Sequence, residues 1–245
     1  MVMMLERPGL PEMREIKSKP TGISILDKRL DGGLPEGSLV CVYANPISMP
    51  EAFLYQFASV RKTYYFNTSR PAQYIQRNIA AMGFNLENIE FIDVFTQYYL
   101  NKFGQFVLED RYRDKEIFDF IDHHISKILE DGGDYNVIFD SISFFLKLDV
   151  GKGLKEWLIN KLYVASKQSN NLFYIYLMKD VHPDDIVYMV MDICDVIFDI
   201  DSERVGDRIS SRLSILKIRD KPPMMETFKF YISEGIQIDT SRDIA

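Results

Sequence analysis

The sequence predicts an α/β fold, with a twisted, mostly parallel sheet between two layers of helices. Short apolar runs of strand length alternate with amphipathic runs of helical length between residues 39 and 200. Such alternation is typical of a parallel sheet with helices on both faces. Two later strand-like runs, 212–220 and 227–233, flank Pro222 and Pro223 and predict an antiparallel hairpin at the C-terminal end.

Length and composition limit the domain organisation and the kinds of partner. The chain has 245 residues, of which 47% are hydrophobic, and a formal net charge of −7. This is enough apolar material for one large core, so we expect residues 1–19 to form an N-terminal arm and residues 20–245 a single domain. The acidic balance disfavours a general nucleic-acid-binding protein, because such proteins usually present a basic face.

Targeting and metal-binding signals are missing from the sequence. It has no run of 18 apolar residues and no apolar N-terminal core, so we expect a cytoplasmic protein without a membrane span or signal peptide. Cys41 and Cys194 lie in apolar runs and are expected to be reduced core residues; a disulfide between them is the alternative. His123, His124 and His182 do not have the spacing of metal ligands, so no metal site is predicted.

The first elements are a short helix, a buried strand and a longer helix. Residues 21–27 open the short helix, in which Ser24 can act as the N-cap and Asp27 follows at the capping-box spacing. The apolar run 39–43 is expected to be the first strand of the core. Residues 46–61 place apolar side chains on one face at helical spacing and predict a helix.

The later elements follow from the same two periodicities. Strands are expected at residues 62–66, 89–94, 135–139, 171–177 and 196–200. Helices are expected at residues 71–83, 115–131, 152–169 and from Pro183 onward. Residues 95–114 fit neither period and interleave aromatic with polar side chains. We interpret this aromatic-rich insert either as a surface for a partner or as a lid packed on the core.

Residues 38–57 have the layout of a phosphate-binding P-loop, with a buried strand, a turn and then an apolar helix. The turn nevertheless lacks the chemistry of a P-loop, because it contains no glycine and no lysine. Glycines would bring several N–H groups onto one phosphate, whereas Pro46 and Pro50 each remove an N–H group. The carboxylate of Glu51 suits a helix N-terminus but would repel a triphosphate. The alternative interpretation is an ordinary strand–turn–helix connection.

The residues ahead of the first core strand carry a more specific pattern. Its members are Thr21-Gly22-Ile23, Leu26-Asp27, Leu30, Gly32-Gly33-Leu34-Pro35 and Gly37-Ser38. The pattern resembles the start of the RecA-like ATPase core in the KaiC and RadA branch. The resemblance covers residues 20–240 and implies a RecA-like P-loop NTPase fold, a three-layer sandwich with a C-terminal antiparallel hairpin.

The resemblance also implies that catalytic residues have been lost. Counting back along the helix that follows the loop places Pro50 on the P-loop lysine and Glu51 on the hydroxyl residue that binds Mg²⁺. Counting back along the second core strand's exit loop places Thr68 and Ser69 on the glutamate pair that positions the attacking water. A hydroxyl group is not a strong general base near neutral pH, so no catalytic residue is predicted.

One residue of the family's phosphate chemistry is retained, and a pair of cations resembles another of its motifs. Asp140 and Ser141 end an apolar strand that resembles the Walker B strand, whose aspartate holds the Mg²⁺ shell; an aspartate here can equally cap the next turn. Lys217 and Arg219 resemble the Lys-x-Arg that reaches a neighbouring subunit's nucleotide in KaiC-like oligomers; they can equally be solvent-facing strand charges. The predicted vestigial nucleotide site consists of Ala44, Asn45, Ser48, Pro50, Glu51, Thr68, Ser69, Asp140 and Ser141, with Lys217 and Arg219 as contacts in trans.

The first hypothesis for function is a non-catalytic KaiC/RadA-like protein that acts as a regulatory or protein- or peptide-binding module. The resemblance implies self-association into a homo-oligomer or capture of a protein segment, including one from a paralogous RecA-like protein. On this hypothesis the protein is not an enzyme, and ATP and Mg²⁺ are not expected to bind tightly. The alternatives are a nucleotide-binding ATPase with a rebuilt pocket and a DNA recombination or repair accessory protein, which the acidic charge disfavours.

Overall fold

A computed structural model describes residues 17–107, 111–205, 208–219, 221–222, 224 and 226–239. The strands are β1 (Ser18–Lys19), β2 (Leu34–Pro35), β3 (Leu39–Ala44), β4 (Lys62–Asn67), β5 (Ile89–Asp93), β6 (Tyr135–Asp140), β7 (Leu172–Met178), β8 (Val196–Val205), β9 (Arg208–Ile218), β10 (Thr227–Ser233) and β11 (Gly235–Asp239). The helices are α1 (Ser24–Arg29), the 3-10 turn η1 (Pro46–Ser48), α2 (Pro50–Ala58), α3 (Ala72–Ala81), α4 (Val94–Tyr99), α5 (Arg111–Leu129), α6 (Ile142–Lys147), α7 (Lys152–Ser169) and α8 (Asp184–Ile193).

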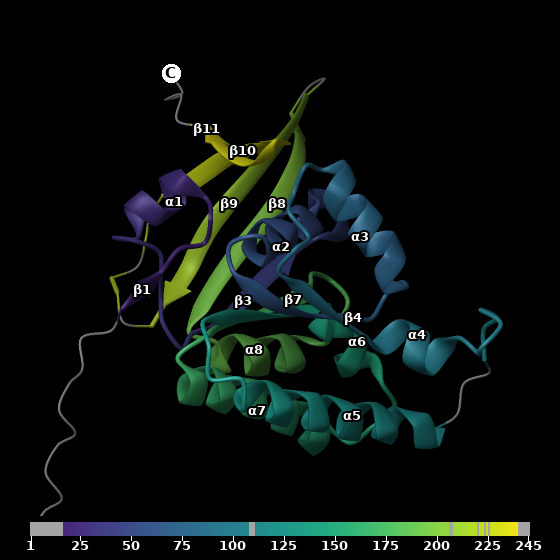
Figure 1. Ribbon diagram of the computed structural model, residues 1–245. Coiled ribbons are helices and arrows are strands. Elements are labelled where there is room, and N and C mark those ends of the chain that lie inside the picture. Colours follow the sequence, from purple (N-terminus) through teal and green to yellow (C-terminus); the bar gives the residue numbers. More distant parts are fainter. Residues whose placement is uncertain are drawn as a thin grey trace, which may run out of the picture.

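A nine-stranded sheet with the order β11-β10-β9-β8-β3-β7-β6-β4-β5 runs through the molecule (Figure 1). The strands from β8 to β5 in this order are parallel to one another. The strands β9, β10 and β11 continue the sheet in antiparallel fashion. The mostly parallel sheet and its C-terminal antiparallel hairpin confirm the predicted fold class.

Helices cover the two faces of the sheet in separate layers (Figure 1). The first core contains α1, α2 and α3, which pack on one face and also on the inner side of the antiparallel strands. The second core contains α5, α6, α7 and α8 on the opposite face. The parallel strands are buried on both faces, which is why they read as continuous apolar runs in the sequence.

Cys41 and Cys194 are free and buried, as predicted. The segment predicted as an N-terminal arm lies outside the described residues up to residue 16, and its division from the domain stays a prediction. Ser18 and Lys19 form β1, which pairs with β2 in a separate two-stranded sheet.

The capping box predicted for the first helix is wrong. Ile23 is the N-cap of α1, and Ser24 is already its first residue. Asp27 turns its carboxylate back instead, and it accepts hydrogen bonds from the backbone N–H groups of Thr21 (2.8 Å) and Gly22 (3.1 Å). The carboxylate therefore satisfies N–H groups of the chain that leads into the helix.

The helix predicted for residues 46–61 is divided into two parts. The turn η1 ends at Ser48, and α2 begins at Pro50. Between them Met49 adopts a left-handed conformation, with φ of 54°, which a helix cannot include. The short helix α6 was not predicted, because its six residues follow β6 directly and are too few to show a period.

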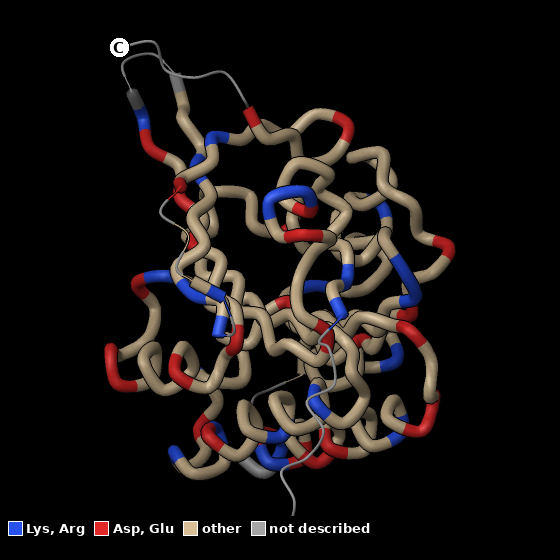
Figure 2. The backbone as a smooth tube through the Cα atoms, turned by 90° about the vertical axis from the view of Figure 1, so that its left-hand side faces the viewer, with Lys and Arg blue, Asp and Glu red and all other residues tan. Residues whose placement is uncertain are grey.

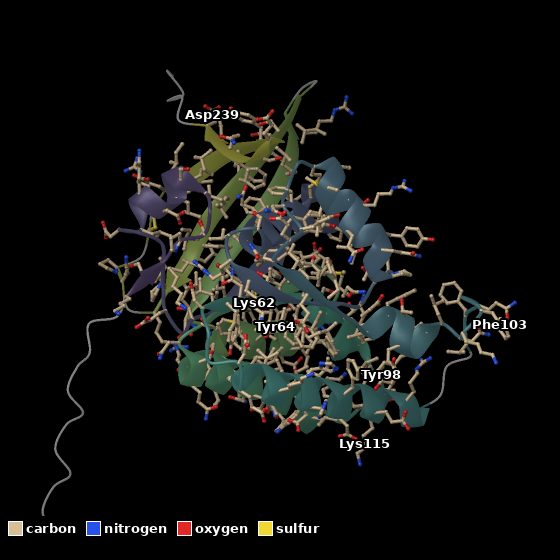
Figure 3. All side chains as sticks on the ribbon, viewed as in Figure 1. Lys62, Tyr64, Tyr98, Phe103, Lys115 and Asp239 are labelled. Carbon is tan, nitrogen blue, oxygen red and sulfur yellow. The ribbon has the colours of Figure 1, made fainter. Side chains whose placement is uncertain are left out.

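The aromatic-rich insert is packed on the core at its base and exposed at its tip, and its role as a surface for a partner stays a prediction. Tyr98 and Tyr99 pack against the second core, and the hydroxyl group of Tyr98 donates a 3.3 Å hydrogen bond to the backbone of α5. Phe103 and Phe106, by contrast, are each 75% exposed. Phe103 lies on the loop beyond α4, at the margin of the molecule (Figure 3). The base of the insert is therefore a lid, and its tip is an exposed aromatic surface.

Charged residues of both signs are interspersed along the chain over the surface (Figure 2). The carboxyl ends of β3, β4, β6 and β7 meet at one end of the parallel sheet, and their amino ends meet at the other. Ligands of open parallel sheets bind beyond the carboxyl ends of the strands. A ligand-binding site is therefore expected at the carboxyl ends of these strands.

Candidate functional site

A cleft of about 360 Å³ opens at the carboxyl ends of the parallel strands. Its lining comes from the carboxyl ends of β6 and β7, the segments that follow β3, β4 and β6, and the first turn of α2: Pro46, Glu51, Ser69, Arg70, Asp140, Ser141, Tyr176 and Met178. We call this the carboxyl-end cleft. Glu51, Ser69, Asp140 and Ser141 were predicted for the vestigial site, so the fold brings residues from three separate segments of that prediction together.

The loop after β3 is built by local contacts that leave little room for a phosphate cradle. Asn45 accepts a hydrogen bond from the backbone N–H of Ile47 (3.2 Å) and so caps η1. Pro46 and Pro50 have no N–H group and occupy the first positions of η1 and α2. Ala44 and Ser48 are buried, and neither lines the cleft. The backbone donors that a P-loop would present at this position are therefore reduced in number.

Glu51 lies in the first turn of α2, where its charge complements the helix dipole. Its Oε1 atom lies 3.9 Å from a guanidinium nitrogen of Arg70, in the loop after β4. Both side chains are partly exposed, so solvent weakens this ion pair. The cation of the cleft thus comes from Arg70, a residue that the sequence analysis did not assign to the site. Its position directly after the predicted Thr68 and Ser69 was the available signal.

Asp140 is the buried acid of the cleft, with only 6% of its surface exposed. The hydroxyl group of Tyr65 donates a 2.9 Å hydrogen bond to its Oδ2 atom. Burial raises the pKa of the Asp140 carboxyl group to about 6, although the Tyr65 hydrogen bond and the Arg70 charge act to lower it. Glu51 contributes in the same direction as burial. Glu51 and Asp140 are therefore two like charges that line the same cleft.

Thr68 has a structural role at the base of the cleft. Its backbone N–H and its hydroxyl group both donate to the carbonyl oxygen of Asp140, at 3.0 and 2.9 Å. The N–H group of Ser141 donates in turn to the Thr68 hydroxyl oxygen (3.0 Å). These bonds join the ends of β4 and β6. Ser69 is exposed at the cleft, one residue further along.

Tyr176 is a second residue of the cleft that the sequence analysis missed. Only 5% of the residue's surface is exposed. Among the described residues its hydroxyl group has no hydrogen-bond partner. Burial raises the pKa of this hydroxyl group, so it keeps its proton. Its signal in the sequence was its place near the end of an apolar strand, which is also what a plain core tyrosine would show.

Lys217 and Arg219 are not near the cleft. The structure places them at the opposite end of the sheet, where Lys217 donates to the backbone oxygens of Met191 and Asp192, both at 2.9 Å. Arg219 donates to the Asp192 oxygen as well (2.6 Å). The two cations thus satisfy carbonyl groups at the C-terminal end of α8. The contact in trans that was predicted for them stays a prediction.

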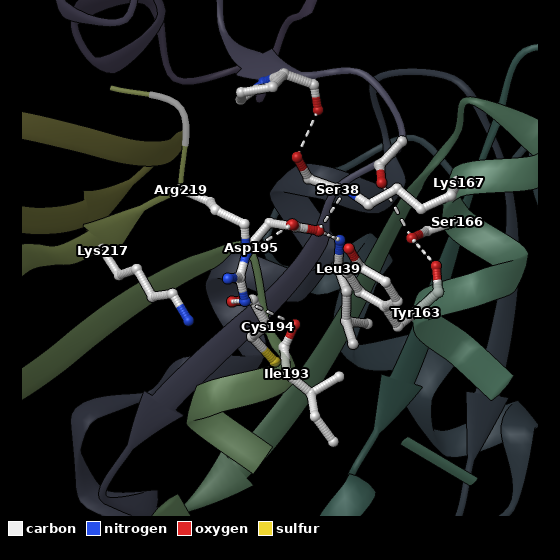
Figure 4. Close-up of polar contacts among 12 residues, drawn as sticks. Ser38, Leu39, Tyr163, Ser166, Lys167, Ile193, Cys194, Asp195, Lys217 and Arg219 are labelled. Carbon is white, nitrogen blue, oxygen red and sulfur yellow. Dashed lines mark hydrogen bonds and ion pairs between the residues drawn. The ribbon is translucent and has the colours of Figure 1, made fainter. Parts of the chain in front are cut away.

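Arg219 also takes part in a cluster around Asp195, which Figure 4 shows at the amino end of β3 and β8. Asp195 Oδ2 accepts hydrogen bonds from the backbone N–H of Leu39 (2.9 Å) and from Lys167 Nζ (2.8 Å). Arg219 Nε lies 3.3 Å from Asp195 Oδ1. We call these four residues the Asp195 cluster. The cluster joins α7 and β3 to Asp195, which directly precedes β8, and to Arg219, which directly follows β9.

In the described part of the chain, no group of three or more His, Cys, Asp and Glu residues is arranged to hold a metal ion. Within the same ranges, no helix has both the length and the apolar character needed to cross a membrane.

The fold is similar to that of the KaiC-like protein PH0186 from the hyperthermophilic archaeon Pyrococcus horikoshii OT3, whose crystal structure superimposes with a TM-score of 0.70. The two chains are 16% identical, and the match covers 92% of this chain and 100% of that chain. This likeness establishes a RecA-like, KaiC-like fold. No curated protein matches the chain. Residues 18–245 match a family of unknown function (DUF7125), and the chain belongs to that family.

Proposed function

We propose that this protein is a non-catalytic KaiC-like protein that works by binding a protein partner and does not hydrolyse ATP. The observation that carries the proposal is the pair of carboxylates in the cleft. Glu51 stands in the first turn of α2 and Asp140 is buried beside it, so a triphosphate would meet negative charge where a P-loop offers N–H groups and a lysine.

The geometry of the loop supports the same proposal. Two prolines and the left-handed Met49 replace the glycine-rich turn. Thr68, at one of the positions aligned with the catalytic glutamates, is engaged by the Asp140 carbonyl and the Ser141 N–H group. A hydroxyl group held in this way has neither the basicity nor the freedom to orient an attacking water.

The alternative, a nucleotide-binding protein with a rebuilt pocket, has one observation in its favour. Arg70 places a guanidinium group at the cleft, 3.9 Å from Glu51, and guanidinium groups bind phosphate well. On this alternative Arg70 would take the place of the missing lysine. The two readings differ in what Mg-ATP does to the folded protein.

Thermal unfolding with and without Mg-ATP tests the proposal. A ligand at a hundred times its Kd adds about 2.7 kcal/mol to the free energy of unfolding, which raises Tm by several degrees in a domain of this size. We expect no shift with ATP, ADP or GTP at millimolar concentration. A shift that Arg70→Ala or Asp140→Ala abolishes would overturn the proposal in favour of the rebuilt pocket.

The tip of the insert supports a protein as the partner. Phe103, Phe106 and Val107 expose apolar surface on a loop that projects from α4, and aromatic side chains are enriched at protein interfaces. Size-exclusion chromatography with light scattering will measure self-association. We expect the oligomer to dissociate in a Phe103→Ser, Phe106→Ser variant, while the exposed Tyr188→Ser serves as the matched control on α8. A monomeric wild-type protein would remove self-association from the proposal.

A further inference from the structure

We infer that the carboxyl-end cleft is a binding site for a primary ammonium group on an apolar stem, held between Asp140, Glu51 and the hydroxyl oxygen of Tyr176. The inference rests on the proposed function in one respect, namely that no triphosphate occupies the cleft. It goes beyond that proposal because it names the ligand chemistry of the site.

Among the described residues, the buried carboxylate of Asp140 takes part in no ion pair, although the Arg70 charge acts on it from a distance. Arg70 is the cation that lines the cleft, and its ion pair is with Glu51. The side chain of Asp140 has a hydrogen bond from Tyr65, a neutral donor. A buried carboxylate is costly unless it is paired with a cation. A positive ligand would supply the missing charge.

Tyr176 is the second, independent observation. Its hydroxyl group is buried, lines the same cleft and has no hydrogen-bond partner among the described residues. Buried polar groups in folded proteins almost always have a partner, and an exception points to an unseen ligand or water. The phenol oxygen can accept one N–H, while Asp140 and Glu51 accept the others. An ammonium group has three N–H donors to offer.

The walls of the cleft are apolar where its charges end. Pro46 and Met178 complete the lining. Ile47 and Met49 follow Pro46 in the loop and are exposed. An alkyl stem attached to the ammonium group would pack against Pro46 and Met178 and lose its contact with water. A lysine side chain and a small primary alkylamine both have this chemistry.

Other ions fit the cleft less well. Mg²⁺ and Ca²⁺ take six or more oxygen ligands, several of them often water, and the guanidinium group of Arg70, 3.9 Å from Glu51, repels a divalent ion more strongly than a monovalent one. An inorganic anion would meet the charges of Glu51 and Asp140 at close range. A quaternary ammonium ion has the right charge but no N–H donor for the Tyr176 oxygen.

Binding should depend on pH through Asp140. The titratable and charged side chains that face it are Glu51, Tyr55, Tyr65, Arg70 and Tyr176. The three tyrosines remain neutral because burial raises each of their pKa values, and the arginine remains charged. As the pH falls below about 6, Asp140 takes up a proton and no longer attracts the ammonium group.

Isothermal titration calorimetry of the full chain tests the inference. The probes are n-butylammonium and the methylamide of Nα-acetyl-lysine, with tetramethylammonium as the probe that has charge but no N–H donor. We expect millimolar binding of the first two at pH 7.5 and about tenfold weaker binding of tetramethylammonium, because charge-assisted hydrogen bonds are lost. Affinity should fall again at pH 5.

Variants place the binding in the cleft. Asp140→Asn should weaken binding about tenfold or more, and Tyr176→Phe about threefold to tenfold. Asp31→Asn changes the net charge equally at a residue whose side chain is 91% exposed outside the cleft, and it should leave the affinity unchanged. Tighter binding of the lysine derivative assigns the ammonium group to a protein segment, and tighter binding of butylammonium assigns it to a free amine.

The inference is overturned if neither probe binds, if Asp140→Asn and Asp31→Asn behave alike, or if Mg²⁺ alone binds more tightly than the amines. These outcomes are separate from the fate of the proposed function, which Mg-ATP tests. If the protein binds neither ATP nor the amines, the proposed function stands and this inference is wrong.

Discussion

The two ends of the parallel sheet each carry a buried aspartate, and the two are treated very differently. Asp195, 4% exposed, receives a backbone N–H group and two cationic side chains. Asp140, 6% exposed, receives one neutral hydroxyl group. The two carboxylates are buried to a similar extent, but among the described residues only that of Asp195 forms ion pairs. A carboxylate whose partners all come from its own chain is explained by the fold, whereas one that lacks a cation points beyond it.

Asp195 and Asp140 also lie at opposite ends of the parallel strands. The Asp195 cluster lies at the amino ends of the strands, where a backbone N–H group and two cationic side chains of the chain itself already pair with the carboxylate. Asp140 lies at the carboxyl ends, where strand exits diverge and side chains from several loops can surround a ligand. Replacing each aspartate in turn tests whether the two carboxylates differ in their contribution to stability.

Asp195→Ala should have the largest effect. It leaves the Leu39 N–H group without its acceptor and Lys167 and Arg219 without their shared carboxylate, and removal of a buried charged partner costs several kcal/mol. We expect the free energy of unfolding to fall by about 4 kcal/mol. Urea denaturation at pH 7 measures it, with Lys167→Ala as the milder control because that side chain is partly exposed.

Asp140→Asn should act in the opposite direction. The raised folded pKa of about 6, against 3.8 unfolded, means that the native state binds more protons between these values, so stability falls as the pH rises through this window. At pH 7 the ionised group costs about 3 kcal/mol. The Asn amide offsets part of the gain, since its N–H₂ group needs partners, so we expect about 2 kcal/mol of stabilisation.

The pH profile of Asp140→Asn is the sharper measurement. The gain over the wild-type protein should be full above pH 6 and vanish below pH 4, as followed by denaturation midpoints across that range. A variant that is less stable than the wild type at pH 7 would show that Asp140 is as well satisfied as Asp195, and the contrast between the two ends would be lost.

A smaller effect is expected from two tyrosines, of which Tyr65 donates to Asp140 from the core and Tyr176 lines the cleft. Tyr65→Phe removes the donor to the Asp140 carboxylate and should lower stability by about 1.5 kcal/mol at pH 7, with a smaller loss once the carboxyl group is protonated. Tyr176→Phe removes a hydroxyl group without a partner in the described chain, and stability should change by less than about 0.5 kcal/mol. Equal losses would mean that the Tyr176 hydroxyl has a partner in solution.

Arg70→Ala should have the smallest effect on stability. The ion pair with Glu51 is long and partly exposed, and such pairs contribute about 0.5 kcal/mol. Its more informative consequence is on Asp140, whose pKa the Arg70 charge lowers. Titration of the Asp140 carboxyl group by NMR should therefore show a higher pKa in the variant. An unchanged value would mean that Arg70 does not face the cleft in solution.

The sequence predicted the sheet and its layers because these depend on periodicities that neighbouring residues share. The strand positions and the layout of the loop after β3 were predicted for the same reason, whereas Glu51 and Asp140 were assigned from the resemblance to P-loop and Walker B segments. The prediction of a capping box at Ser24 was wrong because the Asp27 carboxylate accepts hydrogen bonds from the N–H groups of Thr21 and Gly22, which precede the helix. Spacing alone does not distinguish the two uses.

The remaining parts of the site depend on contacts between distant segments. Arg70 belongs to the cleft only because β4 pairs with β6, and Tyr176 only because β7 pairs with both β3 and β6. Lys217 and Arg219 have the spacing of a motif, yet the carbonyl groups of α8 occupy them. A sequence shows which side chains are chemically able, and the fold decides which of them meet.

The strand order has a consequence for the order of events during synthesis. Both neighbours of the central strand β3, β7 and β8, come from the last third of the chain. A ribosome adding roughly 5–20 residues per second makes β3 wait on the order of ten seconds for β7, about 130 residues later. Such distant pairings also slow folding. During that interval the apolar β3 lacks both of the strands that flank it in the native sheet.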